Sequence, residues 1–162
     1  MWRILMADFN KAIVITLKNE GGYINDPLDK GGETKYGISK KSYPDLDIKS
    51  LSIEQAKEIY KKDFWDCLKC NFIENQKLAN KIFDMSVLMG IKNVVKKLQL
   101  VICLKYCVNI TIDGIIGIET LNYINGHKSD IIYEEFIKQL DNYLHDLNKP
   151  KYIQGWIKRL YS

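Results

Sequence analysis

The amino-acid sequence predicts a mainly α-helical fold with a small β element near residues 23–38. Apolar residues recur at helical spacing along most of the chain, and cap and stop signals divide this pattern into separate helices. Between Gly21 and Gly37 the chain has too many glycines and turn residues for a helix. We therefore expect loops and a short hairpin in this segment, with helices after it and before it.

The expected helices follow from local signals at their ends. Asp8 has the type and place of an N-cap, and Ser52 with Gln55 forms the capping-box pattern. Gly90 is the stop of another helix, and Ser129 is expected to cap a later one. The expected ranges are 8–19, 52–68, 76–89, 92–108, 118–125, 129–147 and a last short helix that ends near residue 161.

Length and composition indicate one compact body. The 162 residues are 27% charged and 46% hydrophobic, which are ordinary values for a globular protein. No run approaches the roughly 18 apolar residues of a membrane-spanning helix. The chain has no Pro/Ser-rich linker, so we expect its two lobes, residues 1–90 and 91–162, to pack together. We also expect the protein to be a monomer.

The net charge of +4 is modest and suits an anionic substrate. Most lysines alternate with acids, so the dense basic stripe of a nucleic-acid-binding protein is missing. Asp8 interrupts the first apolar run before it reaches the length of a secretory signal. We therefore expect synthesis in a cytosol.

Glu20 is the first candidate for a catalytic group. It continues an apolar stripe at helical spacing, and Gly21 and Gly22 then end the helix and allow a close approach of backbone or substrate. Apolar surroundings disfavour the charged form of a carboxyl group, which suits a general acid. The alternative is a surface carboxylate at a helix C-terminus, where the helix dipole opposes it.

The motif around Glu20 resembles a known enzyme family. Glu-Gly-Gly-Tyr at residues 20–23 and Asp-Pro-x-Asp-x-Gly-Gly-x-Thr-x-x-Gly-Ile at residues 26–38 are similar to glycoside hydrolase family 108, N-acetylmuramidases of the lysozyme-like superfamily that are mostly phage or prophage endolysins. Residues 83–90 contain Asp84 and Gly90, and they resemble a helix of that family that carries the pattern Asp-x-x-x-x-x-Gly. Residues 113–120 and 155–159 resemble its C-terminal predicted peptidoglycan-binding segment.

This resemblance implies a function and a fold. It implies an α+β lysozyme-like fold and an endolysin that hydrolyses the β-1,4 bond between N-acetylmuramic acid and N-acetylglucosamine, with Glu20 as the general acid. Made in the host cytoplasm, such an enzyme reaches the wall only after release, for which a holin is one partner. The alternative from another class is a non-catalytic peptidoglycan-binding or structural phage protein that keeps the fold.

A second catalytic group is expected in the loop that follows. Asp26 and Asp29 could hold or activate the attacking water, although Asp beside Pro or Gly is also a common turn former. Some lysozyme-like enzymes use a single Glu with a water held by Thr or Tyr, which makes Thr34 a candidate. We assign Asp29 and Thr34 to catalysis and Asp26 to substrate binding.

Three aromatic residues could stack on sugar rings. Tyr23 and Tyr36 lie in the loop and are expected to bind substrate. Trp65 lies at helical spacing and is expected in the core instead. Asp84 is expected to make a structural hydrogen bond, Asp113 to serve a turn, and Trp156 and Arg159 to dock the last helix onto the body.

The four cysteines form two closely spaced pairs, Cys67 with Cys70 and Cys103 with Cys107. Such pairs could bind zinc. Both lie in helical patterns that lack the turn residues of a zinc knuckle, so we expect buried free thiols and neither a metal nor a cofactor. A wall amidase or peptidase would need a zinc site or an activated cysteine, and we find neither pattern.

Overall fold

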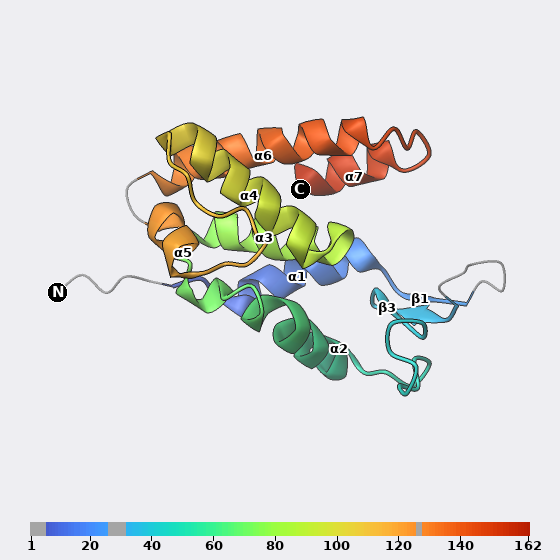
Figure 1. Cartoon of the computed structure of the whole chain (residues 1–162). Coiled ribbons are helices and arrows are strands. Elements are labelled where there is room, and N and C mark those ends of the chain that lie inside the picture. The colour runs from blue at the N-terminus through green and yellow to red at the C-terminus, as the bar shows by residue number, and fades with distance from the viewer. Residues whose placement is uncertain (1–5, 26–31, 126–127) are drawn as a thin grey trace.

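The computed structural model describes residues 6–25, 32–125 and 128–162. Helices form the body, and a small sheet lies beyond one end of it (Figure 1), which confirms the expected mainly α fold with a minor β element. The α-helices are α1 (Phe9–Glu20), α2 (Ile53–Tyr60), α3 (Gln76–Met89), α4 (Ile91–Tyr106), α5 (Ile118–Ile124), α6 (Ser129–Asp146) and α7 (Ile153–Leu160). A π-helical turn, η1 (Lys61–Asp66), continues α2, and a 3-10 turn, η2 (Cys70–Phe72), follows it.

α3 lies at the centre of the body, where it packs against α1, α4 and α6. Phe83 of α3 meets the rings of Phe9 and Trp65 edge-on, with centroid distances of 5.9 and 5.6 Å. Edge-to-face packing is a favourable geometry for aromatic rings. Trp65 is fully buried, which confirms its expected place in the core.

Local capping explains where α1 and α2 begin. The carboxylate of Asp8 accepts a hydrogen bond from the backbone N–H of Asn10 at 2.9 Å. Ser52 and Gln55 exchange side-chain-to-backbone bonds of 3.1 and 2.8 Å, so the capping box is confirmed. Such a cap typically contributes about 1 kcal/mol.

The prediction that Ser129 caps α6 is wrong. Ser129 is the first residue of the helix, and Lys128 holds the cap position without a side-chain bond. The Ser129 hydroxyl instead accepts a hydrogen bond of 3.2 Å from the amide of Asn75, which precedes α3. The hydroxyl that the local sequence pattern predicts as a helix cap is therefore used in a tertiary hydrogen bond instead.

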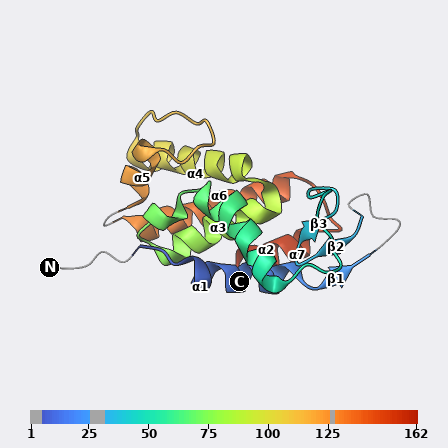
Figure 2. The same cartoon turned by 90° about the horizontal axis from the view of Figure 1, so that it is seen from below.

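Three strands of two residues form the antiparallel sheet, in the order β1 (Tyr23–Ile24), β2 (Thr34–Lys35) and β3 (Ile38–Ser39). Only Tyr36 and Gly37 separate β2 from β3, and both have positive φ angles, of 52° and 79°. A two-residue hairpin turn needs this geometry to match the twist of the strands. The sheet and the loop that follows it lie beyond the C-terminal end of α1 (Figure 2).

The C-terminal helices complete the body. α4 packs against α6, and α7 folds back beside α6 so that it comes near the end of α1 (Figure 1). Asp113 has the turn role expected of it, because its carboxylate accepts hydrogen bonds of 2.8 Å from Gln99 and from the N–H of Ile115. The hydrogen bond to Gln99 is the main cause that lowers the pKa of Asp113. None of the helices in the described ranges is long and apolar enough to cross a bilayer.

The thiols differ in burial, and the expectation of four core thiols is wrong. Cys70 is fully buried, and burial raises its pKa well above the ordinary value. Cys67 and Cys107 are exposed and Cys103 is half-buried. Cys107 follows α4 in the left-handed region and Cys67 follows η1, so both lie just beyond the helices in which the sequence pattern placed them.

Candidate functional site

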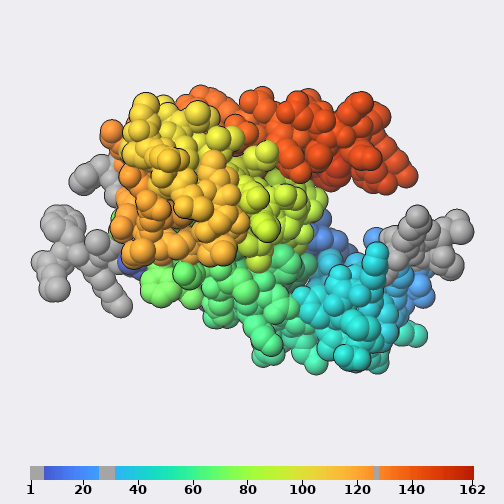
Figure 3. Space-filling model, viewed as in Figure 1, coloured from blue at the N-terminus to red at the C-terminus, as the bar shows by residue number. Residues whose placement is uncertain are grey.

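Glu20 is the last residue of α1, at the point where the helical body meets the sheet. Gly21 follows with a φ of 75°, a backbone conformation that glycine adopts without strain, and turns the chain toward β1. The Glu20 side chain is 17% exposed, so it is largely enclosed and still reachable. The molecular surface is hollowed between the C-terminal helices and the segment that carries the sheet (Figure 3).

Arg159 of α7 is the partner of Glu20. Its Nη1 lies 2.7 Å from Oε1 of Glu20. Its Nε and Nη2 each lie 3.0 Å from an oxygen of Asp84 in α3. The guanidinium therefore joins α7 to the C-terminal end of α1 and to the middle of α3.

Asp84 anchors this arrangement. The residue is 1% exposed, and its Oδ1 accepts a 2.9 Å hydrogen bond from the hydroxyl of Thr16, while the amide of Asn19 lies 3.4 Å from both carboxylate oxygens. This agrees with the structural role expected for Asp84. Burial alone would lower the pKa of Arg159, but the hydrogen bonds and charges of Asp84 and Glu20 outweigh it and raise that pKa.

The expectation that Glu20 faces apolar surface is therefore wrong in one respect. The side chain continues the stripe of α1, yet the group that meets its Oε1 is a guanidinium. Helical periodicity places a residue on a face of its own helix and carries no information about a distant helix that packs there. Arg159 does dock α7, as expected, but it does so on the candidate catalytic group.

The hairpin turn between β2 and β3 borders the other carboxylate oxygen. An ideal Cβ on Gly37 would lie 2.5 Å from Oε2 of Glu20, so only glycine leaves room for the carboxylate there. The hydroxyl of Tyr60 in α2 donates a 2.8 Å hydrogen bond to the carbonyl oxygen of Tyr36. Burial, with a further contribution from the charge of Glu20, raises the pKa of Tyr60 far above its ordinary value, so this phenol stays a neutral donor.

The other predicted site residues are distributed along the sheet. Thr34 lies half-buried in β2, and its hydroxyl donates to the carbonyl of Gly32 at 3.3 Å. Tyr23 in β1 is 42% exposed, and its hydroxyl donates to Glu33 at 2.6 Å. Tyr36 is half-buried in the turn beside Glu20 and packs against the core. Asp26 and Asp29 lie outside the described residues.

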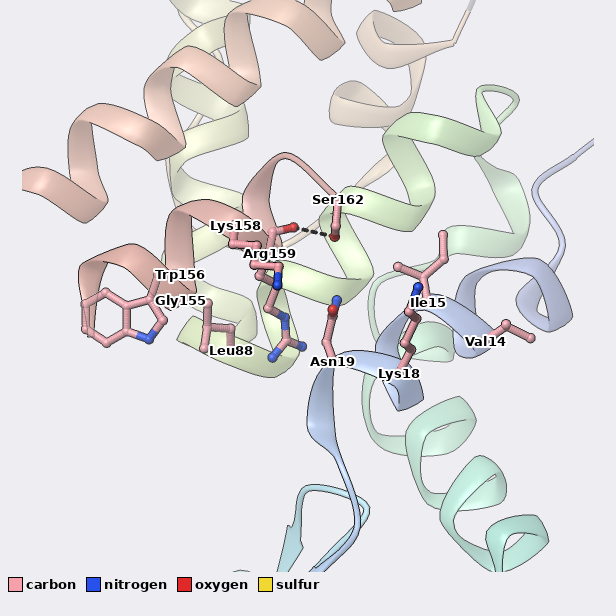
Figure 4. Close-up of a pocket in the computed structure, with 10 residues that line it drawn as sticks. All are labelled: Val14, Ile15, Lys18, Asn19, Leu88, Gly155, Trp156, Lys158, Arg159 and Ser162. Atoms are coloured by element: carbon pink, nitrogen blue, oxygen red, sulfur yellow. Dashed lines mark hydrogen bonds between the residues drawn. The ribbon is translucent and has the colours of Figure 1, made fainter. Parts of the chain in front are cut away.

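A groove of about 750 Å³ lies between α1 and α7, next to the Glu20–Arg159 pair (Figure 4). The residues that line it include Asn19, which precedes Glu20 in the chain, and Arg159, its ion-pair partner, together with the apolar side chains of Trp156 and Leu88. Lys18 and Lys158 add positive charge to its lining. Basic and apolar surface therefore adjoins the candidate catalytic carboxylate.

Two residues of this site were not predicted as functional from the sequence. Tyr60 carries no local signal, because an aromatic residue at helical spacing is ordinary for a core. Arg159 carried only the signal of a cation in the last helical turn. Within residues 6–25, 32–125 and 128–162, we find no group of three or more His, Cys, Asp or Glu side chains arranged to hold a metal ion.

Comparisons with known proteins agree with this geometry. Residues 13–90 match the family Glycosyl hydrolase 108, and this segment includes Glu20, Tyr60 and Asp84. No protein of curated function matches the chain. The solved structure of Brucella abortus SagA is similar with a TM-score of 0.78 and 25% sequence identity, over 94% of this chain and 89% of that one. The chain is therefore a glycoside hydrolase with a lysozyme-like α+β fold, and its residues 13–90 are similar to the family Glycosyl hydrolase 108.

Proposed function

We propose that this chain is a muramidase that hydrolyses the β-1,4 bond between N-acetylmuramic acid and N-acetylglucosamine in peptidoglycan, with Glu20 as the general acid. The observation that carries the proposal is the setting of the Glu20 carboxylate. It begins the Glu-Gly-Gly-Tyr motif, lies where the body meets the sheet, and is held at one oxygen while remaining 17% exposed. A positioned carboxyl group beside an accessible surface is what proton donation to a bound glycan requires.

The reaction needs one proton and one water molecule. Glu20 gives its proton to the glycosidic oxygen, the bond from that oxygen to the anomeric carbon breaks, and the leaving sugar departs as an alcohol. Water then supplies a hydroxyl to the anomeric carbon, and its remaining proton restores Glu20. Glycosidases generally assign the activation of water or the nucleophilic step to a second group.

We assign the second group to the segment 23–38, where Asp29 and Thr34 are the candidates. Thr34 is half-buried in β2, and the one hydrogen bond described for its hydroxyl goes to the carbonyl of Gly32. Tyr23, Tyr36 and Asp26 would shape the sugar-binding surface, and the exposed ring of Tyr23 supports this for that residue. Thr34→Val should lower kcat far more than it lowers the free energy of unfolding. A loss of kcat no larger than the loss of folded protein accounts for would assign Thr34 to structure alone.

The biological setting that we propose is that of a phage or prophage endolysin. Its support is the resemblance of residues 20–38 to the muramidases of that group. The chain would be made in the cytoplasm of the host, act as a monomer and reach the wall after release, with a holin as one release partner. The net charge of +4 suits an anionic wall.

The decisive experiment is lysis of purified cell walls by the wild type and by Glu20→Gln, followed by turbidity. Loss of a positioned general acid costs on the order of 10²–10⁴ in rate, so the variant should be nearly inactive while its melting temperature changes little. Glu54→Gln, in the exposed first turn of α2, removes the same charge away from the site and should keep full activity.

The bond that is cut is tested by product analysis. Digestion should release new reducing ends, and borohydride should convert muramic acid to its alditol. Reduced glucosamine would instead show a glucosaminidase. Substantial lysis by a folded Glu20→Gln variant would refute the role of Glu20.

A further inference from the structure

We propose that α7 is part of the active site and that Arg159 is a positioning residue for Glu20, which it holds in place and stabilises as the carboxyl group gives up its proton. This inference rests on the proposed role of Glu20 as the general acid. It adds a residue from the far end of the chain, beyond the segment 13–90 that matches the hydrolase family.

The guanidinium is placed independently of Glu20. Nε and Nη2 of Arg159 bind the two oxygens of Asp84, and Nη2 also lies 3.2 Å from the backbone carbonyl of the same residue. Nη1 remains for Glu20, at 2.7 Å. Because the planar fork of arginine has fixed angles between its donors, the grip on Asp84 also fixes the direction of Nη1.

The surroundings keep this fork rigid. The side chain of Arg159 is 10% exposed and that of Asp84 is 2% exposed, so the pair is largely removed from solvent. Lys81 of α3 donates to the backbone carbonyls of Arg159 at 3.2 Å and Ser162 at 3.3 Å, which ties the end of α7 to α3. Removing one partner from a buried charge pair typically costs more than breaking an exposed one.

This placement matters for the proton transfer itself. As the proton moves from Glu20 to the glycosidic oxygen, negative charge develops on the carboxylate, and the electrons of the breaking bond stay with the departing oxygen. A cation already 2.7 Å from Oε1 stabilises that developing charge without reorganisation. The same contact holds the carboxylate against rotation, next to the glycine turn at residue 37.

The test compares three variants of the full chain on soluble glycan fragments, with kcat and KM measured separately. Arg159→Met should lower kcat on the order of 10²-fold, as the loss of one preorganised donor does, with KM changed by less than about twofold because the group acts through Glu20. Arg159→Lys keeps the positive charge but loses the planar fork of donors, so its kcat should lie between that of Arg159→Met and that of the wild type. Lys149→Met removes an exposed cation from the turn before α7, away from the lining of the groove, and should match the wild type.

Thermal unfolding of each variant separates positioning from folding. A folded Arg159→Met protein with wild-type kcat would overturn the inference, and so would a rise in KM that accounts for the whole loss. If Arg159→Met does not fold, Arg159→Lys decides: an intermediate kcat supports the inference and a wild-type kcat overturns it. Activity lost in Glu20→Gln but kept in the Arg159 variants would refute this inference and leave the proposed function intact. Activity kept in Glu20→Gln would remove both.

Discussion

Replacement of Gly37 by alanine should disturb the candidate catalytic carboxylate through a single methyl group. The added Cβ would come 2.5 Å from Oε2 of Glu20, about 1 Å inside ordinary van der Waals contact. The backbone at Gly37 has a φ of 79°, which adds about 1–2 kcal/mol of strain for any residue with a Cβ. Overpacking adds about 1–3 kcal/mol more, so the free energy of unfolding should fall by about 2–5 kcal/mol.

Activity should fall further than stability alone explains. The methyl group also meets the hydroxyl of Tyr60, so its accommodation displaces both this hydroxyl and the Glu20 side chain from their places beside the turn. A misplacement of about 1 Å can cost on the order of 10² in rate. Wall turbidity measured well below the melting temperature of the variant, where the chain is folded, reports this loss directly.

Gly32→Ala is the matched control. Gly32 also has a positive φ, of 67°, but an ideal Cβ there meets nothing within 4 Å. It should therefore show the backbone strain of about 1–2 kcal/mol without the contact. A Gly37→Ala protein that loses no more stability than this control and lyses walls at the wild-type rate would show that the reasoning about the turn is wrong.

Two further predictions concern the buried phenol and the thiols. Burial raises the pKa of Tyr60 above its ordinary value of 10.0, so above about pH 10 the unfolded chain loses a proton that the folded chain keeps. The free energy of unfolding should then fall with rising pH, by up to about 1.4 kcal/mol per pH unit from this group. Urea unfolding of Tyr60→Phe at several pH values should show a shallower fall than the wild type. The same fall in both proteins would contradict the assignment. Iodoacetamide should modify the exposed thiols Cys67 and Cys107 in the native protein and Cys70 only after unfolding, as mass spectrometry can resolve; rapid native labelling of Cys70 would show that its burial is wrong.

Much of the fold follows from short-range signals that act within a few residues. The N-cap at Asp8, the capping box at Ser52 and the end of α3 at Gly90 all match the sequence prediction, because each depends on hydrogen bonds or backbone angles within one helical turn. The strands near residues 23–38 follow similarly from glycine and turn chemistry. Glu20 was identified as the candidate general acid by its motif and its place at a helix end.

What packs around those local features was decided by the tertiary structure alone. Arg159 and Glu20 lie near opposite ends of the chain, and their ion pair exists because α7 folds back over the end of α1 while Asp84 holds the guanidinium. Ser129 shows the same effect, since Asn75 takes the hydroxyl expected for a cap. Spacing and propensity describe one segment at a time, whereas the partner of a side chain depends on which distant face is buried against it. The sequence by itself therefore determined most of the helices and strands and the candidate acid, and the packing of three helices determined the charge that lies beside that candidate.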